Sequence, residues 1–144
     1  MTTPKRLVVH SDGAARGNPG PAGIGVVLSD ERGRALARLA RYLGKATNNQ
    51  AEYAALLLAL ETAAAYRPAH IDVLLDSELV VKQLQGVYRV RSPELRPLYE
   101  RSRALLQHFP SASIRHVPRH ENRQADALAN KAIDEAAGGQ VDRG

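Results

Sequence analysis

The chain has 144 residues, of which 44% are hydrophobic, so it is long enough to bury the core of one domain. It contains no cysteine, which excludes disulfide bonds and thiolate metal sites. Its net charge of +5 favours a polyanionic partner such as nucleic acid, whereas one Phe and no Trp disfavour a protein that grips single strands by base stacking.

The organisation of the chain is that of a single unit. No repeat, low-complexity tract or linker interrupts it, which predicts one domain over residues 1–137 followed by a mobile tail over residues 138–144. No apolar run reaches membrane-spanning length, and the start of the chain lacks an apolar leader. We therefore expect a cytoplasmic monomer without a membrane partner.

Three strands are predicted in the first third of the chain. Residues 7–11 and 23–29 are rich in strand-forming residues, and residues 34–43 alternate between apolar and polar. The tetrapeptide DERG, residues 30–33, predicts a hairpin turn between the second and third strands. Three consecutive strands favour an antiparallel meander.

A long helix is predicted over KATNNQAEYAALLLALETAAAY, residues 45–66. Thr47 stands three residues before Gln50, which fits a capping box at the start of this helix. Its buried face is expected to carry Tyr53, Leu56, Leu57, Leu60 and Ala64.

The second half of the chain alternates strands and helices. Residues 71–75 form a continuous apolar run, typical of a strand buried on both faces, and residues 113–117 indicate a fifth strand. Helices are expected from about Ser77, from a first turn that contains Pro93, and over residues 124–137. The inward-facing residues of the first two of these helices are expected to be Val80, Val81, Leu84, Val87, Leu95, Leu98, Leu105 and Phe109. Antiparallel strands followed by strand–helix units imply an α/β fold with a mixed five-stranded sheet flanked by helices.

Four acidic residues fall where such a fold would bring them together. Asp12 ends the first strand, Glu52 lies in the first turns of the long helix, Asp76 ends the fourth strand and Asp126 opens the last helix. Each has a structural explanation by itself, because Asp-Gly is a common turn and acids favour helix N-termini. Together at one sheet edge they would repel one another unless a cation lay between them. Mg²⁺ accepts such carboxylates, and two ions about 4 Å apart would stabilise a phosphodiester displacement.

Four stretches occur in the order found in one enzyme family: DGAARGNPGPAGIG, TNNQAEY, DSELVV and NRQADALA. With them the chain resembles a type 1 ribonuclease H over residues 7 to about 137. The resemblance implies a ribonuclease H-like fold and an endonuclease that hydrolyses the RNA strand of RNA/DNA hybrids to 5′-phosphate and 3′-hydroxyl ends. It also implies two Mg²⁺ ions bound with substrate, with Mn²⁺ as a substitute, and the metal ligands Asp12, Glu52, Asp76 and Asp126.

Asn48 and Asn49 carry hydrogen-bond donors and acceptors beside the predicted metal site. A 2′-hydroxyl is both donor and acceptor, and it distinguishes RNA from DNA. In the resembled family this pair reads the minor groove of the hybrid, so the same role is assigned to it here, with capping of the helix as the alternative. Further substrate contacts are assigned to Gly13, Asn18, Thr47 and Ser77.

The chain departs from well-studied bacterial members between its two middle helices. Where they carry a Trp-bearing basic protrusion that grips substrate, this chain has the short link QGVYRVRSP. The arginines in and after this link could contact phosphates or could belong to a solvated helix face: Arg89, Arg91, Arg96, Arg101 and Arg103.

A second departure concerns the stretch VPRHENRQAD. Family members often carry a histidine on a longer flexible loop before the last aspartate, where it aids proton transfer or product release. Here His120 precedes Asp126 by six residues, and we assign it that catalytic role, with Glu121 as a lesser candidate. The alternative is that His120 is an exposed loop residue.

Two other functions are compatible with this pattern. A non-catalytic hybrid-binding module would use the same fold, but it would gain nothing from acids that face phosphates. A nuclease of the same fold could act also on double-stranded RNA or on a DNA transposition end. The stretch TNNQAEY favours RNA recognition over DNA strand transfer.

Overall fold

The computed structural model describes residues 4–142. The strands are β1 (Arg6–Ala15), β2 (Gly20–Asp30), β3 (Ala35–Ala46), β4 (His70–Leu75) and β5 (Ala112–His116). The helices are α1 (Asn48–Ala64), α2 (Glu78–Leu84), α3 (Arg96–Leu106) and α4 (Arg123–Asp142), with the short 3₁₀ helix η1 (Arg119–Asn122) before α4. The predicted order of strands and helices is confirmed, and η1 is the addition to it.

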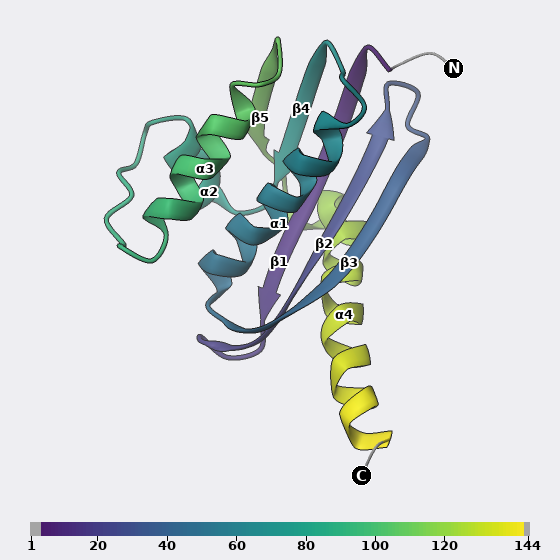
Figure 1. The fold of residues 1–144 in the computed structure, drawn as a ribbon, viewed down its shortest axis with the longest axis vertical. Coiled ribbons are helices and arrows are strands. Elements are labelled where there is room, and N and C mark those ends of the chain that lie inside the picture. Colours follow the sequence, from purple (N-terminus) through teal and green to yellow (C-terminus); the bar gives the residue numbers. More distant parts are fainter. Residues whose placement is uncertain (1–3, 143–144) are drawn as a thin grey trace.

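The five strands form one mixed sheet in the order β3-β2-β1-β4-β5. The first three strands are antiparallel, whereas β4 runs parallel to β1 and β5 parallel to β4. The helices α1, α2 and α3 lie on one side of this sheet, and α4 crosses the other side (Figure 1). The predicted α/β fold is therefore confirmed, and β1 is its central strand.

The main core lies between the sheet and α1. Thr47 caps α1, and its hydroxyl and the Gln50 side chain form the predicted capping box. The buried face of the helix includes Tyr53, Leu56 and Leu60, as predicted. Ala64 is exposed, however, so its assignment to this face is wrong. Ala63 takes the next buried position because it follows Leu60 at the helical spacing of three residues.

Strand β1 is longer than predicted and does not end at Asp12. It continues to Ala15, and Asp12 pairs with Gly25 of β2. A side chain on Gly23 or Gly25 would collide with the backbone of α4, so these two glycines let the helix lie directly on the ladder. Asp12 is consequently held inside a hydrogen-bonded strand.

Helix α2 begins as predicted and ends early. The Ser77 hydroxyl accepts a hydrogen bond from the Val80 backbone N–H at 3.3 Å and caps the helix. After Leu84 the chain leaves the helix through Gly86, whose φ of +80° favours glycine. Val87 is 61% exposed, so the prediction that it faces inward is wrong: it lies beyond the helix.

Helix α3 begins later than predicted. Pro93 lies in a turn before the helix, where the Ser92 hydroxyl accepts from the backbone N–H three residues on. Pro97 instead occupies the first helical turn, where its missing N–H costs nothing. Phe109 is buried as predicted, but it follows the end of the helix.

Helix α4 extends beyond the predicted residue 137. Its backbone is helical to Asp142, and residues 143–144 lie outside the described part of the chain. The mobility of the tail over residues 138–144 stays a prediction. Within residues 4–142, no helix combines the length and apolar character needed to cross a membrane.

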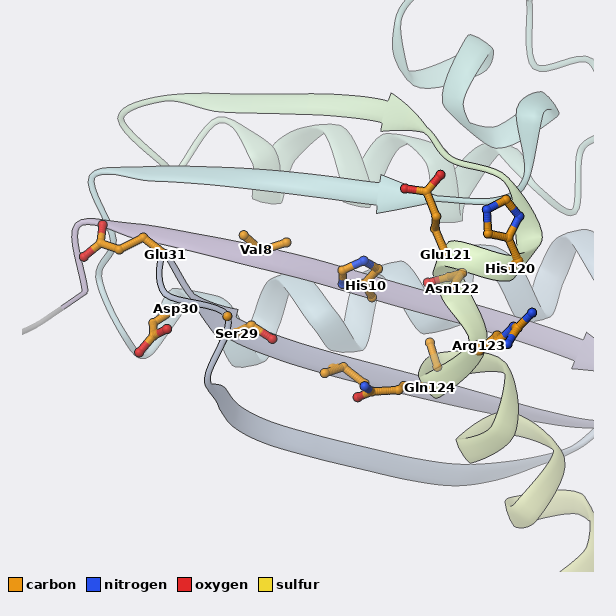
Figure 2. Close-up of a pocket in the computed structure, with 13 residues that line it drawn as sticks. Val8, His10, Ser29, Asp30, Glu31, His120, Glu121, Asn122, Arg123 and Gln124 are labelled. Carbon is orange, nitrogen blue, oxygen red and sulfur yellow. The ribbon is translucent and has the colours of Figure 1, made fainter.

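A pocket of about 600 Å³ lies on the α4 side of the sheet (Figure 2). Its floor includes Val8 and His10 of β1, and its walls are η1 at one end and the β2–β3 hairpin at the other. His120 and Glu121 line the η1 end. The pocket therefore lies on the same side of the sheet as α4.

Candidate active site

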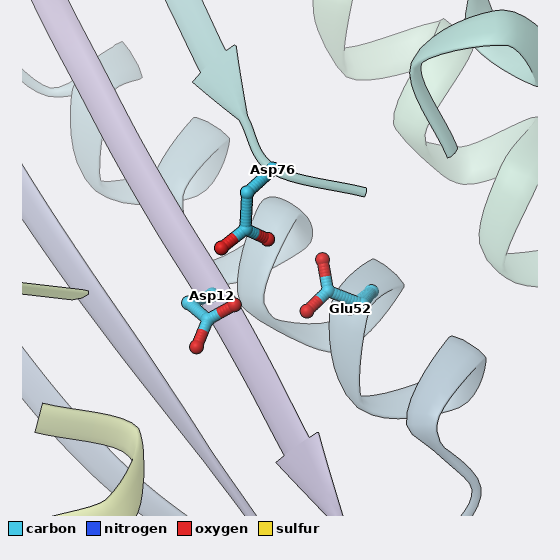
Figure 3. Close-up of side chains that lie close together, drawn as sticks. All are labelled: Asp12, Glu52 and Asp76. Atoms are coloured by element: carbon cyan, nitrogen blue, oxygen red, sulfur yellow. The ribbon is translucent and has the colours of Figure 1, made fainter. Parts of the chain in front are cut away.

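Three acidic side chains from three separate elements meet beside the end of β4. Asp12 comes from β1, Glu52 from α1, and Asp76 directly follows β4 (Figure 3). One carboxylate oxygen of each lies within 4.8 Å of the other two. Asp12 and Glu52 are buried, with exposed fractions of 5% and 9%. Such a buried cluster of carboxylates is costly unless positive charge offsets it.

The fold sets the position of each acid. Parallel pairing places the end of β4 beside β1, so Asp76 emerges next to Asp12. Gly13 has no Cβ, and a Cβ there would collide with the α1 backbone at Ala51. The helix can thus lie against β1, and the Gly13 backbone N–H donates a 2.9 Å hydrogen bond to Glu52 Oε1.

The electrostatics of the cluster favour a bound cation. Burial, followed by the neighbouring carboxylates of Glu52 and Asp76, holds the pKa of Asp12 far above its usual range. Burial also raises the pKa of Glu52, although the Gly13 N–H opposes this by stabilising the ionised form. A divalent cation would remove the repulsion and favour the ionised carboxylates. The residues present therefore fit a hard metal ion.

These raised pKa values predict an unusual pH dependence of stability. Because the folded state holds protons on Asp12 and Glu52 that the unfolded state has lost, stability in EDTA should fall as pH rises from about 5 to about 8. Glu52→Gln should flatten this decline and stabilise the metal-free protein by roughly 1 kcal/mol near pH 8. Thermal denaturation of both proteins across this range measures the effect, and parallel curves for the two would contradict it.

Asp126 approaches the cluster from the first turn of α4. It is not among the three acids within 4.8 Å of one another, but its carboxyl adds to the causes that raise the pKa of Asp12, after burial and the two nearer acids. Its Oδ1 lies 3.3 Å from Asn130 Nδ2 and 3.9 Å from a guanidinium nitrogen of Arg119. The structure thus brings three predicted ligands together and places the fourth on the α4 side of Asp12.

His120 lies on η1 and is exposed, as is Glu121. The same turn carries a residue that sequence reasoning missed. Asn122 is 1% exposed, and its Nδ2 donates a 2.9 Å hydrogen bond to the backbone carbonyl of Ser11. This bond fixes η1 against β1 directly before Asp12. The only sequence signal for Asn122 was its place as a polar residue shortly before the helix that carries Asp126.

The structure separates the roles of the predicted Asn pair. Because Thr47 caps α1, neither Asn48 nor Asn49 provides the cap. Asn48 Oδ1 accepts from the Ala15 backbone N–H at 2.9 Å, and the Asn48 backbone N–H donates to Asn18 Oδ1 at 3.1 Å. The Asn49 side chain makes no hydrogen bond with any other residue of the range 4–138, in which side chains are described.

The remaining candidates are partly occupied by structural contacts. The Thr47 and Ser77 hydroxyls accept from backbone N–H groups at helix starts, and the Gly13 N–H is taken by Glu52. The space beside Gly13 is filled by α1, so its missing Cβ serves helix packing. The substrate contacts assigned to these residues stay predictions.

The arginines after α2 divide into two groups. Arg89 and Arg91 are exposed in the link between α2 and α3. Three on α3 contact other surface side chains: Arg96 lies 3.6 Å from Glu100, Arg101 3.1 Å from Glu61, and Arg103 donates to the Tyr99 hydroxyl. Exposed ion pairs of this kind are weak, so the pair with Glu61 leaves Arg101 able to exchange partners, whereas Arg96 also donates to the Val90 backbone carbonyl at 3.1 Å.

Known proteins resemble the chain in sequence. The family described as reverse transcriptase-like matches residues 10–132. A protein of Halobacterium salinarum described as ribonuclease HI is 50% identical over 131 residues, which cover 91% of this chain and 66% of that protein. A ribonuclease H of Alkalilimnicola ehrlichii is 40% identical over 156 residues, covering 90% of this chain and 95% of that protein.

Solved structures resemble it as well. The crystal structure of RNase H1 from Halobacterium salinarum matches with a TM-score of 0.88 and 49% identity, covering 90% of this chain and 98% of that one. The structure of LC11-RNase H1 in complex with an RNA/DNA hybrid matches with a TM-score of 0.87 and 43% identity, covering 91% of this chain and 99% of that one.

The mixed sheet with an acidic cluster beside its central strands defines the class of ribonuclease H-like proteins. Within it, the chain belongs to the ribonuclease H family, as its sequence stretches predict. The family and the cluster together indicate a divalent-metal site. The chain spans 66% of the length of the Halobacterium relative and 36% of three mycobacterial relatives that are 43% identical to it.

Proposed function

We propose that this protein is a metal-dependent endonuclease that hydrolyses the RNA strand of RNA/DNA hybrids and leaves 5′-phosphate and 3′-hydroxyl ends. The observation that carries the proposal is the cluster of Asp12, Glu52 and Asp76 within 4.8 Å, in a chain of the ribonuclease H family. The hybrid bound by the similar LC11-RNase H1 supports the choice of substrate. The proposed enzyme acts as a cytoplasmic monomer.

The four carboxylates of Asp12, Glu52, Asp76 and Asp126 would hold two Mg²⁺ ions, with Mn²⁺ as a substitute, which supply an activated water and stabilise the departing 3′ oxygen. The protein itself holds these carboxylates in position. The β1 ladder holds Asp12, and the Gly13 N–H orients the Glu52 carboxylate. A pure binding module is less favoured, because buried acids facing phosphates would weaken its affinity.

The Asn pair provides two complementary contacts for ribose. Since Asn48 Oδ1 is held by the Ala15 N–H, its amide orientation is set and its NH₂ group is left as a donor for substrate. Asn49 offers both a donor and an acceptor. A 2′-hydroxyl can satisfy each of these groups, whereas the 2′ position of DNA cannot.

Replacing Asn48 and Asn49 together by alanine should lower hybrid cleavage by roughly 10- to 100-fold, the cost of about two hydrogen bonds. The melting temperature should stay near that of the wild type, because Thr47 provides the helix cap. Asn49→Ala alone separates the two residues: it retains the bond between Asn48 and Ala15 and should lose less activity than the double variant. A double variant that cleaves hybrid at the wild-type rate would remove the pair from substrate recognition.

The substrate is tested by incubating end-labelled RNA/DNA hybrid, double-stranded RNA, double-stranded DNA and single-stranded RNA with the protein in Mg²⁺, Mn²⁺ or EDTA. Hybrid should be cut with either metal and not with EDTA. Cleavage of double-stranded RNA at a similar rate would favour the broader nuclease. If hybrid remains intact with both metals, the proposed activity is wrong.

A further inference from the structure

Asp126 has a hydrogen-bonded partner on its own helix that the acidic cluster does not explain. Asn130 lies one turn further along α4, and its Nδ2 stands 3.0 Å from the Asp126 backbone carbonyl and 3.3 Å from Asp126 Oδ1. An asparagine in a helix interior usually competes with the helix for hydrogen bonds. Here it donates to a carboxylate beside the cluster.

Arg16, which directly follows β1, determines which way the Asn130 amide faces. One guanidinium nitrogen of Arg16 lies 3.2 Å from Asn130 Oδ1 and 3.5 Å from the Asn130 backbone carbonyl. A guanidinium can only donate, so the amide must turn its oxygen to Arg16. Its NH₂ group then faces Asp126, which as a carboxylate can only accept. Each donor therefore faces an acceptor in this network, from Arg16 through Asn130 to Asp126.

This network contributes geometry more than stability. Arg16 also forms an ion pair with Asp134 at 2.7 Å, but the two side chains are 45% and 66% exposed. Exposed ion pairs contribute about 0–1 kcal/mol. Arg16 is itself held by a 2.8 Å hydrogen bond from its backbone N–H to the Pro21 carbonyl. The network therefore links the fixed end of β1 to the carboxylate of Asp126.

We propose that Asn130, with its amide oriented by Arg16, is a positioning residue that holds the Asp126 carboxylate in place for cation binding. The inference rests on the proposed role of Asp126 as a metal ligand. Groups that donate to a ligating carboxylate orient it and raise metal affinity, and losing one typically costs about 10- to 100-fold. Asn130 needs no contact with substrate to act in this way.

The test is Mn²⁺ binding to the protein without nucleic acid, measured by isothermal titration calorimetry. Asn130→Leu, which removes the amide and keeps a good helix former, should weaken the affected Mn²⁺ site by about tenfold. Arg16→Met should give an intermediate loss, because the amide stays but is free to turn. Glu135→Gln is the matched control, because it removes an exposed carboxylate of α4 that pairs only with Lys131 at 3.8 Å, and it should bind within about twofold of the wild type.

Asp126→Asn, titrated in the same way, separates the two proposals. If Asp126→Asn weakens Mn²⁺ binding and Asn130→Leu titrates like the wild type, the positioning role is overturned and the ligand role stands. If Asp126→Asn has no effect, the ligand role of Asp126 fails and the inference falls with it. Thermal denaturation should place all the variants within a few degrees of the wild type, so that a loss of binding is not a loss of fold.

Discussion

Replacing Asp12 by asparagine should abolish cleavage of RNA/DNA hybrid. The cleavage rate should fall by at least roughly 10³-fold, which exceeds the usual effect of removing one hydrogen-bond donor from an active site. Asp12 lies within 4.8 Å of both Glu52 and Asp76 and also faces Asp126, so it is the acid shared by the whole cluster. The amide keeps the shape of the side chain but loses the charge that holds a cation. We expect hybrid binding to depend on attraction between basic side chains and phosphates, so it should be retained.

The measurement is a steady-state rate with labelled hybrid, together with a filter-binding affinity for the same hybrid. Glu135→Gln is the matched control, since it makes the same change from carboxylate to amide at an exposed position of α4 and should leave the rate unchanged. An Asp12→Asn protein that turns over like the wild type would remove Asp12 from the metal site.

Asp126→Asn should reduce activity in Mg²⁺ by roughly 10³-fold, whereas His120→Ala should reduce it by about 10²-fold or less. Asp126 acts on the charge of the cluster itself, and Mn²⁺ should restore part of its loss because it tolerates nitrogen ligands better. His120 is exposed on η1, and water can partly replace a proton carrier. The loss of activity in His120→Ala should therefore become smaller as pH rises and hydroxide becomes available.

Steady-state rates of both variants from about pH 6 to about pH 9 distinguish these roles. Glu121→Gln, a change at the neighbouring position on the same turn, tests the lesser candidate for this role in the same assay. Should His120→Ala lose as much activity as Asp126→Asn at every pH, an auxiliary role for the histidine would be wrong.

The elements of the fold were predictable because their signals are local. The capping box of Thr47 and Gln50 can be recognised from four consecutive residues. The buried residues from Tyr53 to Leu60, which come next in the chain, show the helical spacing. Glu52 and Asp76 were predictable as neighbours for a related reason: strand ends and helix starts meet at one edge of an α/β sheet. Asp12 was placed with them on the expectation that its strand ends there, whereas it joins them from within β1.

What could not be predicted depends on residues far apart in the chain. Gly23 and Gly25 of β2 leave room for the backbone of Ala125 and Ala129 on α4, a contact between distant parts of the chain. The bond between Asn122 and Ser11 spans 111 residues, and that between Arg16 and Asn130 spans 114. No pattern within one element announces such contacts, because each side chain alone is an ordinary polar residue.

The ends of the RNA products test the central claim most directly. If the acidic cluster of Asp12, Glu52 and Asp76 directs water at the scissile phosphate, mass spectrometry of a hybrid digested in Mg²⁺ should find 5′-phosphate and 3′-hydroxyl ends, with no product in EDTA. Fragments ending in 2′,3′-cyclic phosphate, which arise when the neighbouring 2′-hydroxyl attacks instead of water, or cleavage that persists in EDTA would contradict the account.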